Sequence, residues 1–138
     1  MIIKENVDIK TELGKLLNNH SNELGKVPYP TDETEEYSFA VYENDELVGG
    51  LIAKYKFHEF YIHSLAVDPS QRGTGIGKQL MEFAEQKAKT LNTNHILLTT
   101  FNYQGENFYP KLGYTEVGRI PNYPEPGVDK IYFLKKLT

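Results

Sequence analysis

The 138-residue sequence predicts an α/β domain built on a single mixed, mostly antiparallel sheet flanked by helices. Three observations support this prediction. Strand-like runs outnumber helical stretches, the helical patterns fall between groups of strands, and the run HILLTTF is almost wholly apolar, as is typical of a strand buried on both faces. A chain of this length can bury one hydrophobic core, so we expect residues 1–138 to form one domain.

The first half of the chain is expected to hold one helix and several strands. Apolar residues at helical spacing predict the helix, two prolines in a polar stretch predict a loop, and alternating apolar residues rich in β-branched and aromatic types predict strands. The expected elements are a short strand at residues 2–3, a helix over 7–24, a loop over 26–37, two strands within 37–57 joined by a turn at 43–46, and a third strand over 58–67.

The second half begins with a long helix that follows a glycine-rich stretch. One apolar stripe at spacings of three and four predicts this helix, and it comprises Ile76, Leu80, Phe83, Ala84, Ala88 and Leu91. The expected elements are the helix ending near residue 92, a strand over 95–101, a short helical segment over 105–113 that Gly113 ends, and strands over 114–120 and 129–137.

The composition limits the functions that the chain can have. Cysteine is absent, which excludes disulfides and a cysteine nucleophile and is compatible with a reducing compartment such as the cytoplasm. The first residues contain no long apolar stretch, so neither a signal peptide nor a membrane anchor is expected. The net charge is −4 and no basic stripe is present, which argues against binding to nucleic acid.

Three glycines at alternate positions precede the long helix. The first amides of a helix have no acceptor within it and carry partial positive charge, so a loop without bulky side chains there can bind phosphate. The predicted phosphate cradle comprises Arg72, Gly73, Thr74, Gly75, Ile76, Gly77 and Lys78. The spacing matches neither the P-loop nor the dinucleotide-binding pattern. The alternative is a glycine-rich turn that binds no ligand.

Two groups of residues resemble the motifs of the GNAT superfamily of N-acetyltransferases. The pattern Q/R-x-x-G-x-G/A following L-x-V-x-P is present as Leu65, Val67, Pro69, Arg72, Gly75 and Gly77. A second group with the family's spacing comprises Asn102, Tyr109, Gly113 and Tyr114. The resemblance covers nearly the whole chain. One departure is Gly105, where the family usually has Ala.

The resemblance implies a GNAT-like, acyl-CoA N-acyltransferase fold with splayed central strands and acetyl-CoA as co-substrate. The strand before the glycines would carry a bulge, and its main chain at Leu65, Ala66 and Val67 would pair with the pantetheine arm. The diphosphate would lie on the amides of the cradle. Asn102 would hydrogen-bond the pantetheine arm, unless it is simply a turn residue at the end of a strand. Many relatives pair as dimers, so a homodimer is compatible with the resemblance.

The chemistry implied is transfer of an acetyl group to an amine. Because cysteine is absent, direct attack in a ternary complex is favoured over a cysteine-bound intermediate. The resemblance assigns Tyr109 as the acid that protonates the leaving thiolate, with a purely structural aromatic as the alternative. For the base, strand alternation places Glu59, Tyr61, His63, Leu65 and Val67 on one face. We favour His63 for its intrinsic pKa, with a packed histidine or a water chain as alternatives.

Several readings stay open at this point. The acceptor can be a small-molecule amine, or a protein N-terminus or lysine, and the chain can also be a non-catalytic acyl-CoA-binding module. HEFYIH resembles the zinc motif H-E-x-x-H, but the second histidine comes one residue late and the segment reads as a strand, so no metal is expected. The acidic stretch at residues 32–36 can attract a cationic acceptor or be a solvated loop.

Overall fold

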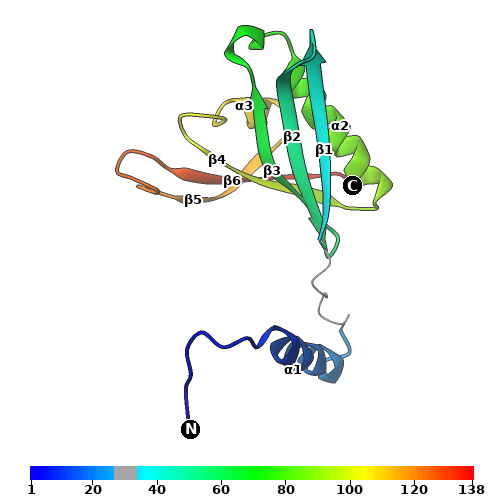
Figure 1. Cartoon of the computed structure of the whole chain (residues 1–138), viewed down its shortest axis with the longest axis vertical. Helices are drawn as coiled ribbons and strands as arrows, with labels where there is room; N and C mark the ends of the chain where they lie inside the picture. The colour runs from blue at the N-terminus through cyan, green and yellow to red at the C-terminus, as the bar shows by residue number, and fades with distance from the viewer. Residues whose placement is uncertain (27–33) are drawn as a thin grey trace. The chain divides into compact units, whose positions relative to one another are not determined.

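The computed structural model describes residues 1–26 and 34–138 (Figure 1). The chain divides into two compact units, Met1–Glu33 and Thr34–Thr138, which are described separately here. The expectation of one domain stays a prediction. Of the predicted loop over residues 26–37, residues 27–33 lie outside the described residues. The prediction is wrong for residues 35–37, which belong to the strand β1 (Glu35–Glu43), so the described end of the acidic stretch at 32–36 runs into that strand.

The first unit contains one regular element, the helix α1 (Lys10–Glu23), which falls inside the range predicted for it. The predicted strand at Ile2 and Ile3 is wrong. Residues 1–9 contain no strand, because within the described part of the chain no other strand pairs with them. Two apolar residues are too few to form a strand without such pairing. None of the helices in the described ranges is long and apolar enough to cross a membrane.

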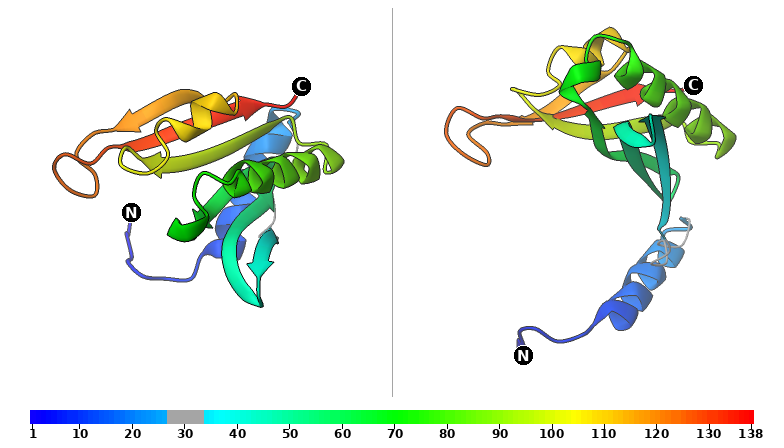
Figure 2. Two further views of the ribbon diagram at one scale, coloured as in Figure 1. Left: turned by 90° about the horizontal axis from the view of Figure 1, so that it is seen from above. Right: turned by 45° about the horizontal axis from the view of Figure 1, so that its top comes forward.

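The second unit is built on one sheet, as predicted, and this sheet has six strands (Figures 1 and 2). In spatial order its strands are β1 (Glu35–Glu43), β2 (Glu46–Lys56), β3 (Glu59–Val67), β4 (His95–Phe101), β6 (Lys130–Lys136) and β5 (Thr115–Ile120). Strands β3 and β4 pair in parallel and the other neighbours pair antiparallel. The sheet is therefore mixed and mostly antiparallel.

The helix α2 (Ile76–Thr90) covers one face of this sheet (Figure 2). Its buried side chains are Leu80, Met81, Ala84 and Ala88, and they pack on the apolar residues of β2, β3, β4 and β6. Phe83 departs from the predicted stripe, since it is 62% exposed and stacks on Phe39 of β1. The helix ends where expected, with Asn92 in the left-handed conformation at φ 58°.

The strand β3 contains a bulge at His63. Ser64 pairs with Ile52 and Ile62 pairs with Ala53, so His63 has no partner on β2. One extra residue reverses the alternation of side chains beyond it. Leu65 therefore lies on the same face as buried Ile62, whereas Tyr61 lies on the opposite face. The expectation that Glu59, Tyr61, Leu65 and Val67 share a face is wrong for this reason.

Strands β3 and β4 separate after a short paired segment. Their parallel pairing joins Phe60, Tyr61 and Ile62 to residues 96–98, and it stops there. Strand β3 continues to Val67 and β4 continues to Phe101 without pairing to each other. This is the splay of the central strands that the resemblance implied. It leaves backbone N–H and C=O groups of the two strands free to pair with something else.

Candidate active site

The loop before α2 is shaped by two glycines. Gly73 has φ 81° and Gly75, the N-cap of α2, has φ 88°, and both values lie in the left-handed region that favours glycine. A Cβ atom added at either position would meet no heavy atom within 4 Å. The requirement for glycine is therefore conformational, and the space in front of both residues is open to a ligand.

The N-terminus of α2 is a free anion-binding group. No side chain caps the helix, because its N-cap residue is Gly75. The amides of the first turn have no acceptor within the helix, and the aligned peptide dipoles place partial positive charge there. Gly77, inside this turn, is needed for space instead, since a Cβ there would lie 3.3 Å from Cζ of Phe108. The loop therefore presents main-chain donors rather than side chains.

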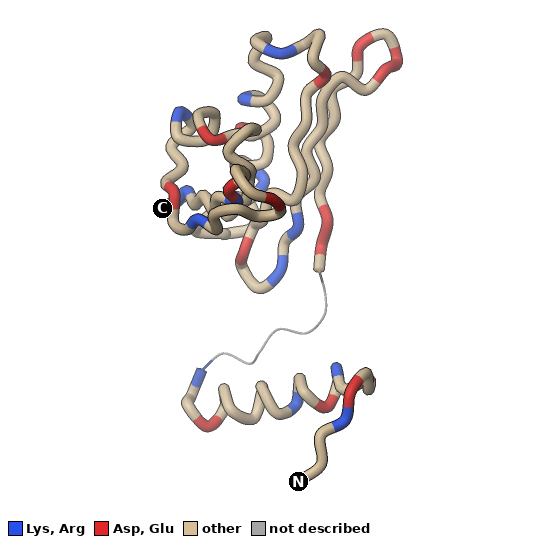
Figure 3. Tube along the Cα trace, turned by 90° about the vertical axis from the view of Figure 1, so that its left-hand side faces the viewer, with Lys and Arg blue, Asp and Glu red and all other residues tan. Residues whose placement is uncertain are grey.

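A cavity of about 990 Å³ extends from this loop into the splay between β3 and β4. It is lined by residues 62–67, 71–73, 75–78, 98–100, 103–105 and 108–109. Among the described residues that line it, Arg72 and Lys78 are cationic and none is acidic. Figure 3 shows Lys and Arg at separate places along the trace rather than in one stripe. The cavity therefore combines an uncapped helix end with two cations, a combination that suits an anionic ligand.

The structure brings most of the predicted site residues to this one cavity. Those that line it are His63, Leu65, Ala66, Val67, Arg72, Gly73, Gly75, Ile76, Gly77, Lys78 and Tyr109. Thr74 is not among them, and its hydroxyl donates to the carbonyl of Gln71 within the loop. Thr74 thus shapes the turn and does not face the cavity.

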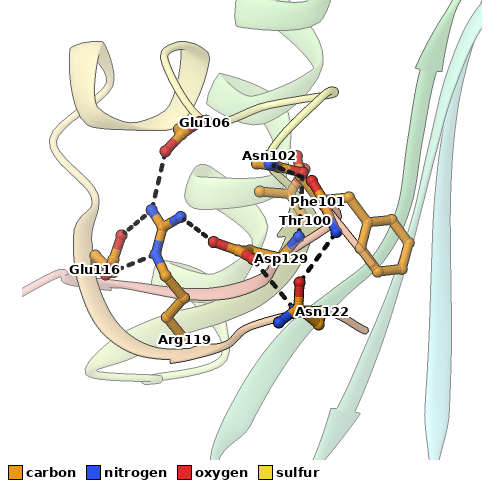
Figure 4. A network of polar contacts seen from close by, with 9 residues as sticks. Thr100, Phe101, Asn102, Glu106, Glu116, Arg119, Asn122 and Asp129 are labelled. Atoms are coloured by element: carbon orange, nitrogen blue, oxygen red, sulfur yellow. Dashed lines mark hydrogen bonds and ion pairs between the residues drawn. The ribbon is translucent and has the colours of Figure 1, made fainter. Parts of the chain in front are cut away.

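Asn102 also lies outside the cavity lining, and Figure 4 shows its side chain in a polar network with Asp129. Its Nδ2 donates to the carbonyl of Gly127 at 3.3 Å, and its Oδ1 accepts from the amide of Asp129 at 3.2 Å. Both ends of the side-chain amide are therefore engaged with the loop between β5 and β6. This geometry matches the alternative role of a structural residue at the end of a strand.

Tyr109 lies on the short helix α3 (Phe108–Lys111) with its ring in the core and is 7% exposed. The rings of Phe108, Tyr114 and Phe133 surround it at centroid distances of 5.0, 5.8 and 5.9 Å. Burial raises the pKa of Tyr109 to about 12, so the phenol is protonated at neutral pH. Within the described residues its hydroxyl has no hydrogen-bond partner. The cavity therefore contains a proton donor that the protein does not use elsewhere.

His63 lies on the β3 bulge at the other wall of the cavity. It is exposed, and its Nδ1 lies 2.8 Å from Oγ of Ser64. Glu59, the other candidate on β3, does not line the cavity, and neither does Tyr61 on the same strand. Glu59 lies 3.6 Å from Nε2 of His95, and the hydroxyl of Tyr61 lies 3.2 Å from Oγ1 of Thr99. Of the residues proposed as base from strand alternation, the geometry leaves His63.

Comparison with known proteins assigns this arrangement to a family. The model of the acetyltransferase (GNAT) family matches residues 11–114. The chain belongs to the GNAT acetyltransferase family. It is an acetyl-CoA-dependent acyltransferase, as the motifs around Gly75 and Tyr109 predicted.

Individual GNAT proteins are similar to this acetyltransferase over most of its length. The blasticidin-S acetyltransferase of Streptomyces morookaense is 32% identical over 101 residues, which are 72% of this chain and 74% of that protein. An acetyltransferase of Bacillus cereus has a crystal structure that matches with a TM-score of 0.78 and 30% identity, over 99% of this chain and 98% of that one. An aminoglycoside 6′-N-acetyltransferase solved with coenzyme A shares the fold at TM-score 0.68 and 23% identity, over 99% of this chain and 95% of that one.

The structure also brings residues to the cavity to which the sequence analysis gave no role in the site. Gly105 lies so close to Tyr109 that an added Cβ would overlap Cε2 of the ring and stand 2.8 Å from Cδ2. The amide of Gly105 donates to Oγ1 of buried Thr100 at 3.1 Å. These two residues and Tyr103 and Gln104 line the cavity of the acetyltransferase beside Tyr109. The departure from the family's usual Ala at position 105 was the one signal in the sequence.

Proposed function

We propose that this acetyltransferase transfers the acetyl group of acetyl-CoA to a primary amine by direct attack in a ternary complex. One observation carries the proposal. A single cavity contains an uncapped helix N-terminus with two cations at one end and a protonated phenol beside the splay of β3 and β4. A diphosphate thioester matches this order of groups, with the anion at the helix and the acyl carbon at the splay.

The residues of the cavity would bind acetyl-CoA in three segments. The first-turn amides of α2, with Arg72 and Lys78, would hold the diphosphate. The main chain of Leu65, Ala66 and Val67 would pair with the pantetheine arm, because β3 has no neighbour on that side beyond Ile62. Supporting this assignment, each of these residues lines the cavity. No such support exists for Thr74 or Asn102 as ligands.

The chemical step follows from the same geometry. The neutral amine attacks the thioester carbon, the C–N bond forms, and the C–S bond breaks as its electron pair goes to sulfur. The Tyr109 hydroxyl gives its proton to that thiolate and regains one from solvent. The proton released from the amine goes to His63, whose imidazole can accept it on a ring nitrogen and pass it to solvent. Because the chain has no cysteine, no cysteine-bound acyl intermediate arises.

A turnover screen tests the proposal. The purified protein is incubated with acetyl-CoA and a panel of amines that contains blasticidin S, aminoglycosides, polyamines, amino acids and short peptides, and free thiol is followed. We expect one small amine to accelerate thiol release and to gain one acetyl group in its mass spectrum. Acetylation of peptides alone would instead show a protein N-terminus or lysine as the acceptor.

Two further measurements separate the remaining readings. If titration calorimetry detects coenzyme A binding but no amine of the panel accelerates thiol release, the chain is a binding module and the catalytic proposal fails. The mass of the protein after incubation with acetyl-CoA alone should not change, and an acetylated protein would overturn direct transfer. The homodimer and the cytoplasmic location stay predictions, and light scattering of the purified protein tests the first.

A further inference from the structure

The helix that carries Tyr109 is too short to fix its own position. It has four residues, Phe108–Lys111, and no side chain caps its N-terminus at Asn107. A helix of one turn has little stability by itself. The position of the Tyr109 hydroxyl therefore depends on the preceding loop, residues 102–107, which we call the 102–107 loop. Residues 103–105 of this loop line the cavity.

The start of the 102–107 loop is tied to the hairpin of β5 and β6. The amide of Asn102 donates to the carbonyl of Asp129 at 3.1 Å, and the Asn102 side chain bonds Gly127 and the Asp129 amide. Asp129 is itself held from the hairpin, because its carboxylate accepts from the amide of Asn122 at 3.3 Å. These contacts connect the loop to Asp129, which also binds Arg119 (Figure 4).

The end of the same loop is tied to the hairpin by Arg119 on β5. Its Nη2 donates to Oε1 of Glu106 at 2.9 Å, and its Nη1 donates to Oδ2 of Asp129 at 3.0 Å. It also binds Glu116 of its own strand at 2.7 Å. One planar guanidinium with several donors can hold three carboxylates in fixed directions, which a lysine cannot do.

We propose that Arg119 is a positioning residue for Tyr109, acting through Glu106 and Asp129 to hold the 102–107 loop. Glu106 lies three residues before Tyr109, the amide of Tyr109 donates to the carbonyl of Gly105 at 3.4 Å, and a Cβ added at Gly105 would overlap the Tyr109 ring. A displacement of the loop is therefore passed to the ring. This inference rests on the proposed function, because it assigns the Tyr109 hydroxyl to the transfer step.

The network supplies its own control. Glu106 and Glu116 both bind Nη2 of Arg119, and their side chains are similarly exposed at 40% and 43%. Glu106 belongs to the 102–107 loop, whereas Glu116 belongs to β5, the strand of Arg119 itself. Glu106→Gln removes the charge that ties the loop. Glu116→Gln removes a charge that accepts from both Nε and Nη2 of Arg119 but lies outside the loop. Exposed ion pairs contribute little to global stability, so both variants should fold.

The kinetic expectation separates the two variants. Because small displacements of a catalytic group have large effects on rate, Glu106→Gln should lower kcat about three- to tenfold with an unchanged KM for acetyl-CoA. Glu116→Gln should keep kcat within about twofold of the wild type. Arg119→Met should lower kcat at least as much as Glu106→Gln does. The double variant with both substitutions should have the same kcat as Arg119→Met alone, because both changes break the same contact.

Hydrogen exchange tests the inference without any activity. The amides of Gly105 and Tyr109 donate to Thr100 and Gly105, so their exchange reports on the loop. Glu106→Gln and Arg119→Met should accelerate this exchange, and Glu116→Gln should not. Equal exchange and equal kcat in the two glutamate variants would overturn the proposal. If the wild type turns over no amine at all, the proposed function fails, but the exchange comparison still decides whether Arg119 holds the loop.

Discussion

Two buried tyrosines in contact allow the catalytic role of Tyr109 to be separated from a structural one. Tyr109 and Tyr114 are 7% and 4% exposed, and their ring centroids are 5.8 Å apart. The Tyr114 hydroxyl donates to Oε1 of Glu85 at 3.2 Å and does not line the cavity. The Tyr109 hydroxyl lacks such a partner within the described residues and belongs to a residue that lines the cavity. Removing the Tyr114 hydroxyl should therefore affect stability, and removing the Tyr109 hydroxyl should affect the proposed transfer step.

The two Phe substitutions should change different quantities, the free energy of unfolding in Tyr114→Phe and kcat in Tyr109→Phe. Tyr114→Phe breaks a hydrogen bond to a charged acceptor and should lower the free energy of unfolding by about 1–2 kcal/mol, with kcat unchanged. Tyr109→Phe breaks no hydrogen bond within the protein, so the free energy of unfolding should stay within about 0.5 kcal/mol. Loss of the proton donor should nevertheless lower kcat about ten- to a thousand-fold, with little change in the KM for acetyl-CoA.

The assays are urea denaturation with linear extrapolation and a thiol-release assay on the same preparations. Both variants keep the aromatic ring, so differences in core packing do not confuse the comparison. Unchanged kcat in Tyr109→Phe would refute the assignment of Tyr109 as the acid. Loss of activity in Tyr114→Phe at full stability would show that the wrong phenol was chosen.

Three further expectations follow from the loop, the ring contact and the pKa. Gly75→Val and Gly127→Val both place a β-branched side chain at a positive φ in open space. Each variant should lose about 1–3 kcal/mol of unfolding free energy. Calorimetry should find coenzyme A binding weakened only in Gly75→Val. In Gly105→Ala the new Cβ must push the Tyr109 ring by about 1 Å, so kcat should fall about tenfold or more. The control is Gly118→Ala, which should keep its kcat because its Cβ would lie 3.8 Å from the nearest atom. Burial raises the pKa of Tyr109 to about 12, so the protonated form persists through pH 10 and is lost only as the pH rises through about 12; a pH–rate profile should show no decline that belongs to an acid of pKa 10.

The elements of the second unit could be predicted from the sequence because their signals are local. Helix α2 follows from the spacing of Leu80, Ala84 and Ala88, and its end follows from Asn92 in a conformation that few residue types adopt. The glycine loop was predicted from three glycines at alternate positions before a helix, which leave the first amides accessible, and the structure adds that Gly73 and Gly75 have positive φ. The strand at residues 2–3 failed because a strand exists only if another strand pairs with it, and two apolar residues do not show whether one does.

The candidate site was predicted in part. Tyr109 and His63 reach one cavity, as expected, but three features depend on contacts between distant segments. The bulge in β3 is an insertion relative to the pairing with β2, and no alternation within one strand reveals it. Asn102 is engaged by a loop 25 residues away in the sequence. Gly105 is required by the ring of Tyr109, which only the folded chain brings against it.

The extra residue in β3 has a consequence for how this acetyltransferase can vary. Before His63 the even-numbered side chains of β3 lie on the face of buried Ile62, and after His63 the odd-numbered side chains lie on that face. Deleting His63 would make the pairing with β2 regular and would keep Leu65 and Val67 on the face of Ile62, but it would remove the local bend and twist that a bulge gives to a strand. Substitutions along β3 therefore leave each side chain on its face, whereas loss of the His63 codon would remove the bend at the point where β3 stops pairing with β4.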